Sequence, residues 1–262
     1  MKKTFCIITL LVTIFGFATE QIPDILIWKN DTISLHNNPL GTYPKLEKLN
    51  LFGDQNAVYS TACWRGFIAE WKIIDNKLYL SNIYSCDYYY SENKIKADLK
   101  KLFPKEYENG LVLANWYSRE LFVTNGKLIN QELKIYESEW ILNLRKGKIV
   151  HEKKFDNSSS YISIYTKNQD SLRNFISKNI NWNNIPQLEK GTHKVYGIIE
   201  SGNSKKDFTV KVKSKSKYKE LEKEILRILK LLPEFDFYIK AGRVINRQFV
   251  MPIMFNENKR PK

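Results

Sequence analysis

The chain has 262 residues, of which 43% are hydrophobic, and this is enough material for one large or two small globular domains. Aromatic residues make up 13% of it, which excludes a disordered chain, and only 8 Pro and 11 Gly exclude collagen-like and Pro-rich classes. Lys and Arg number 42 against 28 Asp and Glu, and the net charge of +14 favours an anionic partner: nucleic acid, an acidic membrane surface or an acidic protein.

The first residues have the pattern of a secretory signal peptide. Lys2-Lys3 precedes an apolar run from Phe5 to Phe17, and Gly16 and Ala18 place small residues at the −3 and −1 positions of a cleavage site. The run is shorter than the roughly 20 apolar residues that a membrane span needs. We therefore predict a signal peptide over residues 1–18 and a mature protein in the periplasm. An uncleaved segment would instead anchor the chain in the inner membrane. Export argues against nucleic acid as the partner.

The predicted location determines how the cysteines are interpreted. Cys6 leaves with the signal peptide, and Cys63 and Cys86 remain as an even pair. In an oxidising compartment such a pair favours a disulfide, and two buried free thiols are the alternative that the sequence leaves open.

Residues 22–165 have the pattern of an antiparallel β-rich domain with one helix. Residues 67–74 alternate apolar and polar side chains, as a half-buried strand does. Hairpin turns are predicted at four dipeptides: Asn30-Asp31, Asp75-Asn76, Asn125-Gly126 and Lys146-Gly147. Of these, Asn-Gly is the strongest hairpin signal. The helix is predicted to begin at Ser91 and to end before Pro104.

The last third of the chain follows a different pattern, after a polar cluster at residues 156–160. A connecting helix is expected over residues 166–180, and residues 181–257 form a β-β-α-β pattern. The expected elements of that region are strands over 194–200 and 208–213 around a turn at 201–203, a helix from Ser216 to Leu232 and a last strand that ends at Phe255. The fold class expected for the whole chain is α+β.

Residues 181–257 resemble the carboxy-terminal domain of TonB proteins. Residues 224–235, EILRILKLLPEF, are similar to the helix of that family and its Pro-x-aromatic exit. Residues 242–255, GRVINRQFVMPIMF, are similar to the family's final strand. Ile225 stands where the family commonly has Ala, and Phe237 where it has a second Pro. The resemblance implies a small recognition domain that grips a short segment of an outer-membrane transporter. Because no Pro-rich spacer precedes this region, it does not imply an energy transducer.

The order of these strands predicts an open sheet edge. If the helix joins the second strand to a parallel third, the first strand lies in the middle and the other two are edges. Lys211, Lys213 and Lys215 would protect the second strand, and Pro252 is tolerated in the third because that strand is an edge. The predicted partner-binding edge consists of five residues: Asn246, Arg247, Gln248, Phe249 and Val250. It could accept an extended peptide by strand addition, be covered by the amino-terminal domain, or pair with a second copy in a homodimer.

The sequence favours a binding protein over an enzyme. His36, His151 and His193 are isolated, and no phosphate loop or zinc-ligand spacing occurs, so we predict no catalytic residue, metal or cofactor. The predicted function is therefore capture of a peptide from an envelope protein or an outer-membrane transporter. The alternative is an envelope protein that binds a ligand or glycan, in which Trp64, Tyr88 and Tyr89 form an aromatic platform and the TonB-like domain only docks or dimerises.

Overall fold

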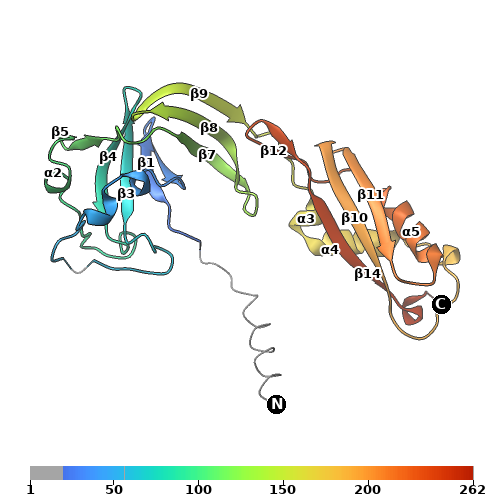
Figure 1. The fold of residues 1–262 in the computed structure, drawn as a ribbon. Helices are drawn as coiled ribbons and strands as arrows, with labels where there is room; N and C mark the ends of the chain where they lie inside the picture. The colour runs from blue at the N-terminus through green and yellow to red at the C-terminus, as the bar shows by residue number, and fades with distance from the viewer. Residues whose placement is uncertain (1–19, 56, 262) are drawn as a thin grey trace, which may run out of the picture. The chain divides into compact units, whose positions relative to one another are not determined.

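The computed structural model describes residues 20–55 and 57–261, so the predicted signal peptide and Cys6 lie outside the described residues. The described part is α+β, as expected: it is mostly sheet, with four short α-helices (Figure 1). None of these helices is both long and apolar enough to cross a membrane. The chain divides into two compact units. The first holds the described residues up to Thr124 with Trp140–Lys153, and the second holds Asn125–Glu139 with the described residues from Lys154 onward.

The first unit is built on a sheet with the strand order β2-β1-β3-β4-β9-β8-β7, and β6 joins β5 to β4. Its elements are β1 (Asp24–Trp28), β2 (Asp31–Leu35), β3 (Ile68–Ile74), β4 (Lys77–Tyr84), α2 (Leu99–Leu102), β5 (Tyr107–Glu108), β6 (Leu111–Leu113), β7 (Glu120–Asn130), β8 (Ile135–Arg145) and β9 (Lys148–Asp156). Short 3-10 turns lie at Leu40–Thr42 and Leu46–Lys48. The division between the units falls within β7, β8 and β9.

The sequence predicts an antiparallel sheet, and the structure corrects this at one pairing. β1 pairs antiparallel with β2 but parallel with β3, with Leu26 opposite Trp71. More than thirty residues separate β2 from β3, and a connection of that length allows a parallel pairing that a hairpin turn does not.

Two of the predicted hairpin turns are confirmed, and Asn125-Gly126 is wrong. Asp75-Asn76 and Lys146-Gly147 have the positive φ angles of tight hairpin turns, whereas the first turn is centred on Lys29-Asn30, one residue earlier than predicted. Gly126 also has a positive φ of 82°, yet β7 continues through it to Asn130. Lys127 N donates there to Glu137 Oε2 at 3.0 Å, so a side chain takes the place of a turn's own hydrogen bond.

The predicted helix from Ser91 is much shorter than expected. Its upstream half bonds to the end of β4 instead: Ser85 N donates to Ile95 O, and Ala97 N to Ile83 O. The helix α2 begins only after Asp98, whose carboxylate accepts from Lys101 N at 3.1 Å.

Asp24 is an ionisable group inside the core of the first unit. Asp24 is fully buried and accepts hydrogen bonds from Ala69 N (3.2 Å) and Trp71 Nε1 (3.0 Å). Arg65 lies beside it, with 3.1 Å between Nη2 and Asp24 Oδ1. Burial raises the pKa of Asp24 to about 6, although the charge of Arg65 and these hydrogen bonds oppose the rise.

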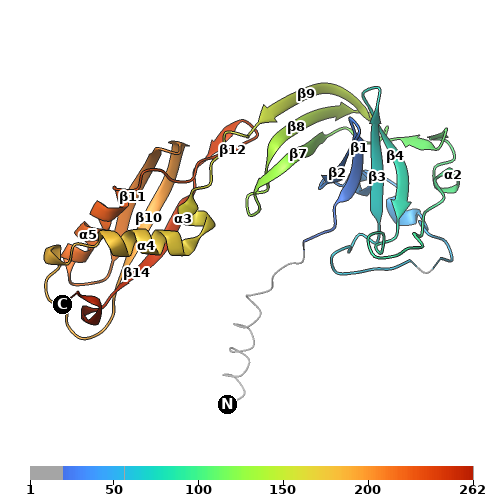
Figure 2. The ribbon, with the colours of Figure 1, turned by 180° about the vertical axis from the view of Figure 1, so that it is seen from behind.

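The second unit contains α3 (Ile164–Lys167), α4 (Gln169–Asn179), β10 (His193–Ser204), β11 (Asp207–Ser214), α5 (Lys219–Leu229), β12 (Tyr238–Lys240), β13 (Arg243–Ile245) and β14 (Gln248–Phe255). Further 3-10 turns lie at Trp182–Asn184 and Glu257–Lys259. β10 pairs antiparallel with both β11 and β14, so the predicted order with the first strand in the middle is confirmed. The helices α4 and α5 cover one face of this sheet (Figure 2).

The core of this unit lies between the sheet and the two helices. Leu172 and Ile176 of α4 and Ile225 and Ile228 of α5 pack there against the inward side chains of the sheet, such as Val195. Every second residue of β14 points the same way, which is why residues 249–255 alternate apolar side chains toward the helices with exposed ones.

Three local features of the second unit differ from the sequence prediction. The turn expected at residues 201–203 lies instead at Lys205-Lys206, because β10 continues to Ser204 with a change of register after Ser201. The helix α5 is shorter at both ends than Ser216–Leu232. A two-stranded hairpin, β12–β13, precedes the last strand and was not predicted.

Candidate functional site

The candidate site is the outer side of β14. In the described residues this strand pairs only with β10, with a register that runs from Glu200 opposite Gln248 to His193 opposite Phe255. It is therefore an edge of the three-stranded sheet.

The direction of its backbone groups follows from two contacts. Arg247 O accepts from Ser201 N at 2.9 Å, so Arg247 and, by alternation, the odd-numbered residues of β14 bond toward β10. The even-numbered residues of β14 direct their backbone groups away from β10. Pro252 is one of them, so its missing N–H removes no hydrogen bond to β10. Gln248, Val250 and Met254 accordingly present their N–H and C=O groups to the open side. The structure gives these outward groups no partner within residues 20–55 and 57–261.

The side chains along this edge alternate between two environments. Phe249 and Met251 are half-buried against the helices, and Ile253 and Phe255 are buried there. The even-numbered side chains lie on the other face, where Val250 is 52% exposed. An added strand would therefore meet apolar side chains on both faces of the sheet.

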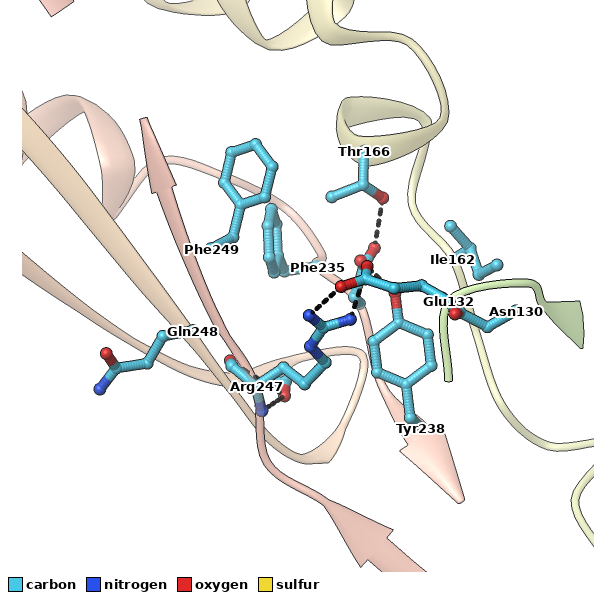
Figure 3. Close-up of a pocket in the computed structure, with 11 residues that line it drawn as sticks. Asn130, Glu132, Ile162, Thr166, Phe235, Tyr238, Arg247, Gln248 and Phe249 are labelled. Atoms are coloured by element: carbon cyan, nitrogen blue, oxygen red, sulfur yellow. Dashed lines mark hydrogen bonds and ion pairs between the residues drawn. The ribbon is translucent and has the colours of Figure 1, made fainter. Parts of the chain in front are cut away.

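A pocket of about 250 Å³ lies at the beginning of β14, beside Gln248 and Phe249 (Figure 3). Phe235 and Phe249 form one wall, with 5.9 Å between their ring centroids. Ile162 and Thr166 line it from the segment before α4. The pocket is thus partly apolar and is open next to the outward backbone of β14.

Asp236 is the buried acid of this pocket, and it is held by neutral donors. Its Oδ1 accepts from Ser163 N (2.8 Å) and Thr166 Oγ1 (2.6 Å), and its Oδ2 accepts from Tyr238 OH (2.6 Å). Burial and these contacts with Asp236 raise the pKa of Tyr238 above its ordinary range, so Tyr238 stays a neutral donor. The network ties the segment before α4 to the strand β12.

Arg247 forms the charged wall of the pocket. Its two Nη atoms donate to the carboxylate of Glu132 at 2.8 and 2.7 Å, and its backbone N donates to Ser201 Oγ at 2.8 Å (Figure 3). The hydrogen bonds and charge of Arg247 lower the pKa of Glu132, which is exposed. These paired hydrogen bonds fix the side chain of Arg247 directly before the first residue of β14.

Glu224 and Arg227 of α5 have a structural role. Glu224 is buried and accepts from Asn181 N (2.7 Å) and Asn184 Nδ2 (2.9 Å), and Arg227 donates to it at 2.6 Å. Arg227 also donates to Asn179 O. The pair therefore fastens the end of α4 and the next turn to α5, and neither residue belongs to β14.

The five predicted edge residues lie in two positions. Asn246 and Arg247 precede β14, while Gln248, Phe249 and Val250 begin it, and the pocket brings Arg247, Gln248 and Phe249 together. Asp236 and Glu132 were missed by sequence reasoning. Neither lies in a motif, and each reaches the pocket from a different segment, so no local pattern could have found them.

The predicted aromatic platform lies in the first unit, beside a disulfide. Cys63 and Cys86 are joined, with 5.9 Å between their Cα atoms. Trp64 is 74% exposed and Tyr89 is 54% exposed, whereas Tyr88 is half-buried and stacks edge-on against Tyr89. Across the described part of the chain, no group of three or more His, Cys, Asp or Glu side chains could hold a metal ion.

Comparison with family models, with curated proteins and with solved structures finds no match to this chain. The likeness to TonB carboxy-terminal domains therefore rests on the residues of the sequence itself.

Proposed function

We propose that this protein is an exported, non-catalytic binding protein of the periplasm, whose TonB-like region captures an extended peptide from an envelope partner. The peptide adds to the outer side of β14 as a fourth strand, and the amino-terminal segment of an outer-membrane transporter is the partner that the family resemblance suggests. The observation that carries this proposal is the unpaired outward backbone of Gln248, Val250 and Met254 at one edge of the three-stranded sheet.

The other edge of the sheet is less suited to a peptide. Along β11 the exposed side chains include Lys211 and Lys213, which are typical of edges that are protected against further pairing. Along β14 the corresponding positions hold Val250 and Met254, and a pocket opens next to the first residues of the strand. Main-chain hydrogen bonds would provide affinity at about 1 kcal/mol each, and the pocket would select one peptide side chain.

A matched pair of variants tests strand addition. Val250→Pro removes an outward N–H, and the sheet should tolerate it because Pro252 already occupies an equivalent position. Val250→Thr keeps that N–H with a side chain of similar shape. We expect Val250→Pro to weaken binding of a transporter amino-terminal peptide at least about tenfold, and Val250→Thr to change it little. Fluorescence anisotropy of a labelled peptide measures both. Equal affinity in the two variants would refute pairing at β14.

A homodimer through β14 would use the same backbone groups. Sedimentation of the wild-type chain with and without peptide separates the two cases. Peptide capture predicts a monomer that binds peptide. A dimer that does not bind the peptide and that dissociates in Val250→Pro would contradict the proposal.

Exposed aromatic side chains of the first unit support a second candidate function, glycan binding. Trp64 and Tyr89 are exposed next to the disulfide, and flat aromatic faces of this kind stack on sugar rings. A glycan array tests this candidate, with Trp64→Ala as the variant that should lose the signal. A signal that survives Trp64→Ala, or no signal with the wild type, contradicts it.

A further inference from the structure

A depression in the first unit lies where β8 turns into β9. The starts of β7 and β9 and the turn at Lys146-Gly147 border it, and its volume is about 1010 Å³. Backbone contacts hold these segments together: Leu144 N donates to Arg119 O at 3.1 Å, and Lys146 N donates to Ser118 Oγ at 2.9 Å. The depression is therefore a fixed feature of the sheet end.

Its charged lining consists of four cations and one carboxylate: Arg119, Arg145, Lys146, Lys148 and Glu120. All four cationic side chains are exposed, and none forms an ion pair with the residues that the structure describes. Lys148 also stands directly opposite Lys77 in the pairing of β4 with β9, where like charges repel. The four cations repel one another, and a bound anion would offset that repulsion.

We propose that this depression binds a ligand that carries several phosphate groups. Arg119 and Arg145 can each hold two phosphate oxygens through the planar guanidinium group, and the lysines add point charges. Ser118 and His151 line the same depression with further hydrogen-bonding groups. The surplus of three positive charges exceeds what one phosphate monoester neutralises, which favours two or more phosphates.

The phosphate groups could belong to a soluble polyphosphate or to lipid headgroups. Val150, which is 56% exposed, lies among the cations, and an apolar side chain in that place is compatible with a lipid surface. Two probes separate the sources: inorganic tripolyphosphate, and phosphatidylcholine vesicles with and without phosphatidic acid. Binding to either phosphate-bearing probe supports the site, and the comparison identifies its source. The site is separate from β14 and does not rest on the proposed function.

The test compares two pairs of substitutions in the whole chain. Arg145→Gln with Lys148→Gln removes half of the lining cations. Lys100→Gln with Lys105→Gln removes the same charge from exposed positions elsewhere in the unit. We expect the first pair to weaken binding of the better probe by about tenfold or more, and the second pair to leave it nearly unchanged. Wild-type affinity should fall as salt is added.

Amide NMR shifts of the wild-type chain give an independent measurement if the first pair of substitutions unfolds the protein. With tripolyphosphate or the vesicles, we expect the largest shifts at residues 118–120 and 143–151. No binding of either probe at low salt, an equal loss of affinity in both pairs, or shifts centred elsewhere would overturn the proposal.

Discussion

Asp24 provides a direct test of how the first unit is held together. The rise in the pKa of Asp24 from 3.8 to about 6 corresponds to about 3 kcal/mol of free energy of unfolding. Because the folded state holds the proton more tightly than the unfolded chain, this contribution is fully present below about pH 4. It is lost as the pH rises through about 6. The cause is burial, which Arg65 and the donors of Ala69 and Trp71 compensate only in part.

The perturbation is Asp24→Asn, which keeps the side-chain volume and does not ionise. Urea unfolding of the wild type and this variant, followed by tryptophan fluorescence between pH 4 and pH 7, gives the difference in the free energy of unfolding. Other carboxylates, such as Glu224 and Glu257, have lowered pKa values, so their contribution to the free energy of unfolding grows as the pH rises. This contribution is the same in the wild type and the variant, and it cancels in the difference. From pH 4 to pH 7 we expect the wild type to lose about 2 kcal/mol of free energy of unfolding relative to the variant, since the rest of the contribution is lost only below pH 4. A difference that is independent of pH would refute a buried Asp24 with a raised pKa.

Three further predictions concern the rest of the structure. Reduction of the Cys63–Cys86 disulfide should lower the free energy of unfolding by about 3 kcal/mol, measured by thermal melts against a Cys63→Ser/Cys86→Ser control that reductant leaves unchanged. Arg227 holds the pKa of Glu224 below its ordinary value, although burial opposes this. Glu224→Gln should therefore lower the free energy of unfolding by about 2 kcal/mol at pH 7, and by less as the pH falls through that lowered pKa. Gly197→Val should destabilise the second unit by about 1–3 kcal/mol in urea unfolding, because an added Cβ lies 2.9 Å from a side chain of α5.

The sheet of the second unit could be predicted from the sequence because its signals are local and agree with one another. The alternating side chains of β14, the amphipathic α5 and the position of Pro252 all lead to the order with β10 in the middle. The same signals could not predict the hairpin β12–β13, whose strands are too short to show a period.

Residues 91–137 were harder to predict because contacts between segments override local propensity there. Asn125-Gly126 has the composition of a hairpin turn, but Glu137 accepts the free N–H of Lys127 and β7 continues. Residues before Asp98 pair with β4 in place of forming a helix. The pocket beside β14 was missed for a related reason, since Asp236 and Glu132 reach it from segments that are distant in sequence.

The outward amides of β14 test the central claim most directly. Backbone NMR of the isotope-labelled chain, recorded while a transporter amino-terminal peptide is added to about 1 mM, reports each of them separately. Strand addition predicts that the signals of residues 246–254 shift, and that the amides of Gln248 and Val250 become protected from hydrogen exchange. No shift in these signals at that concentration, or shifts confined to residues outside β14 and its pocket, would contradict the account.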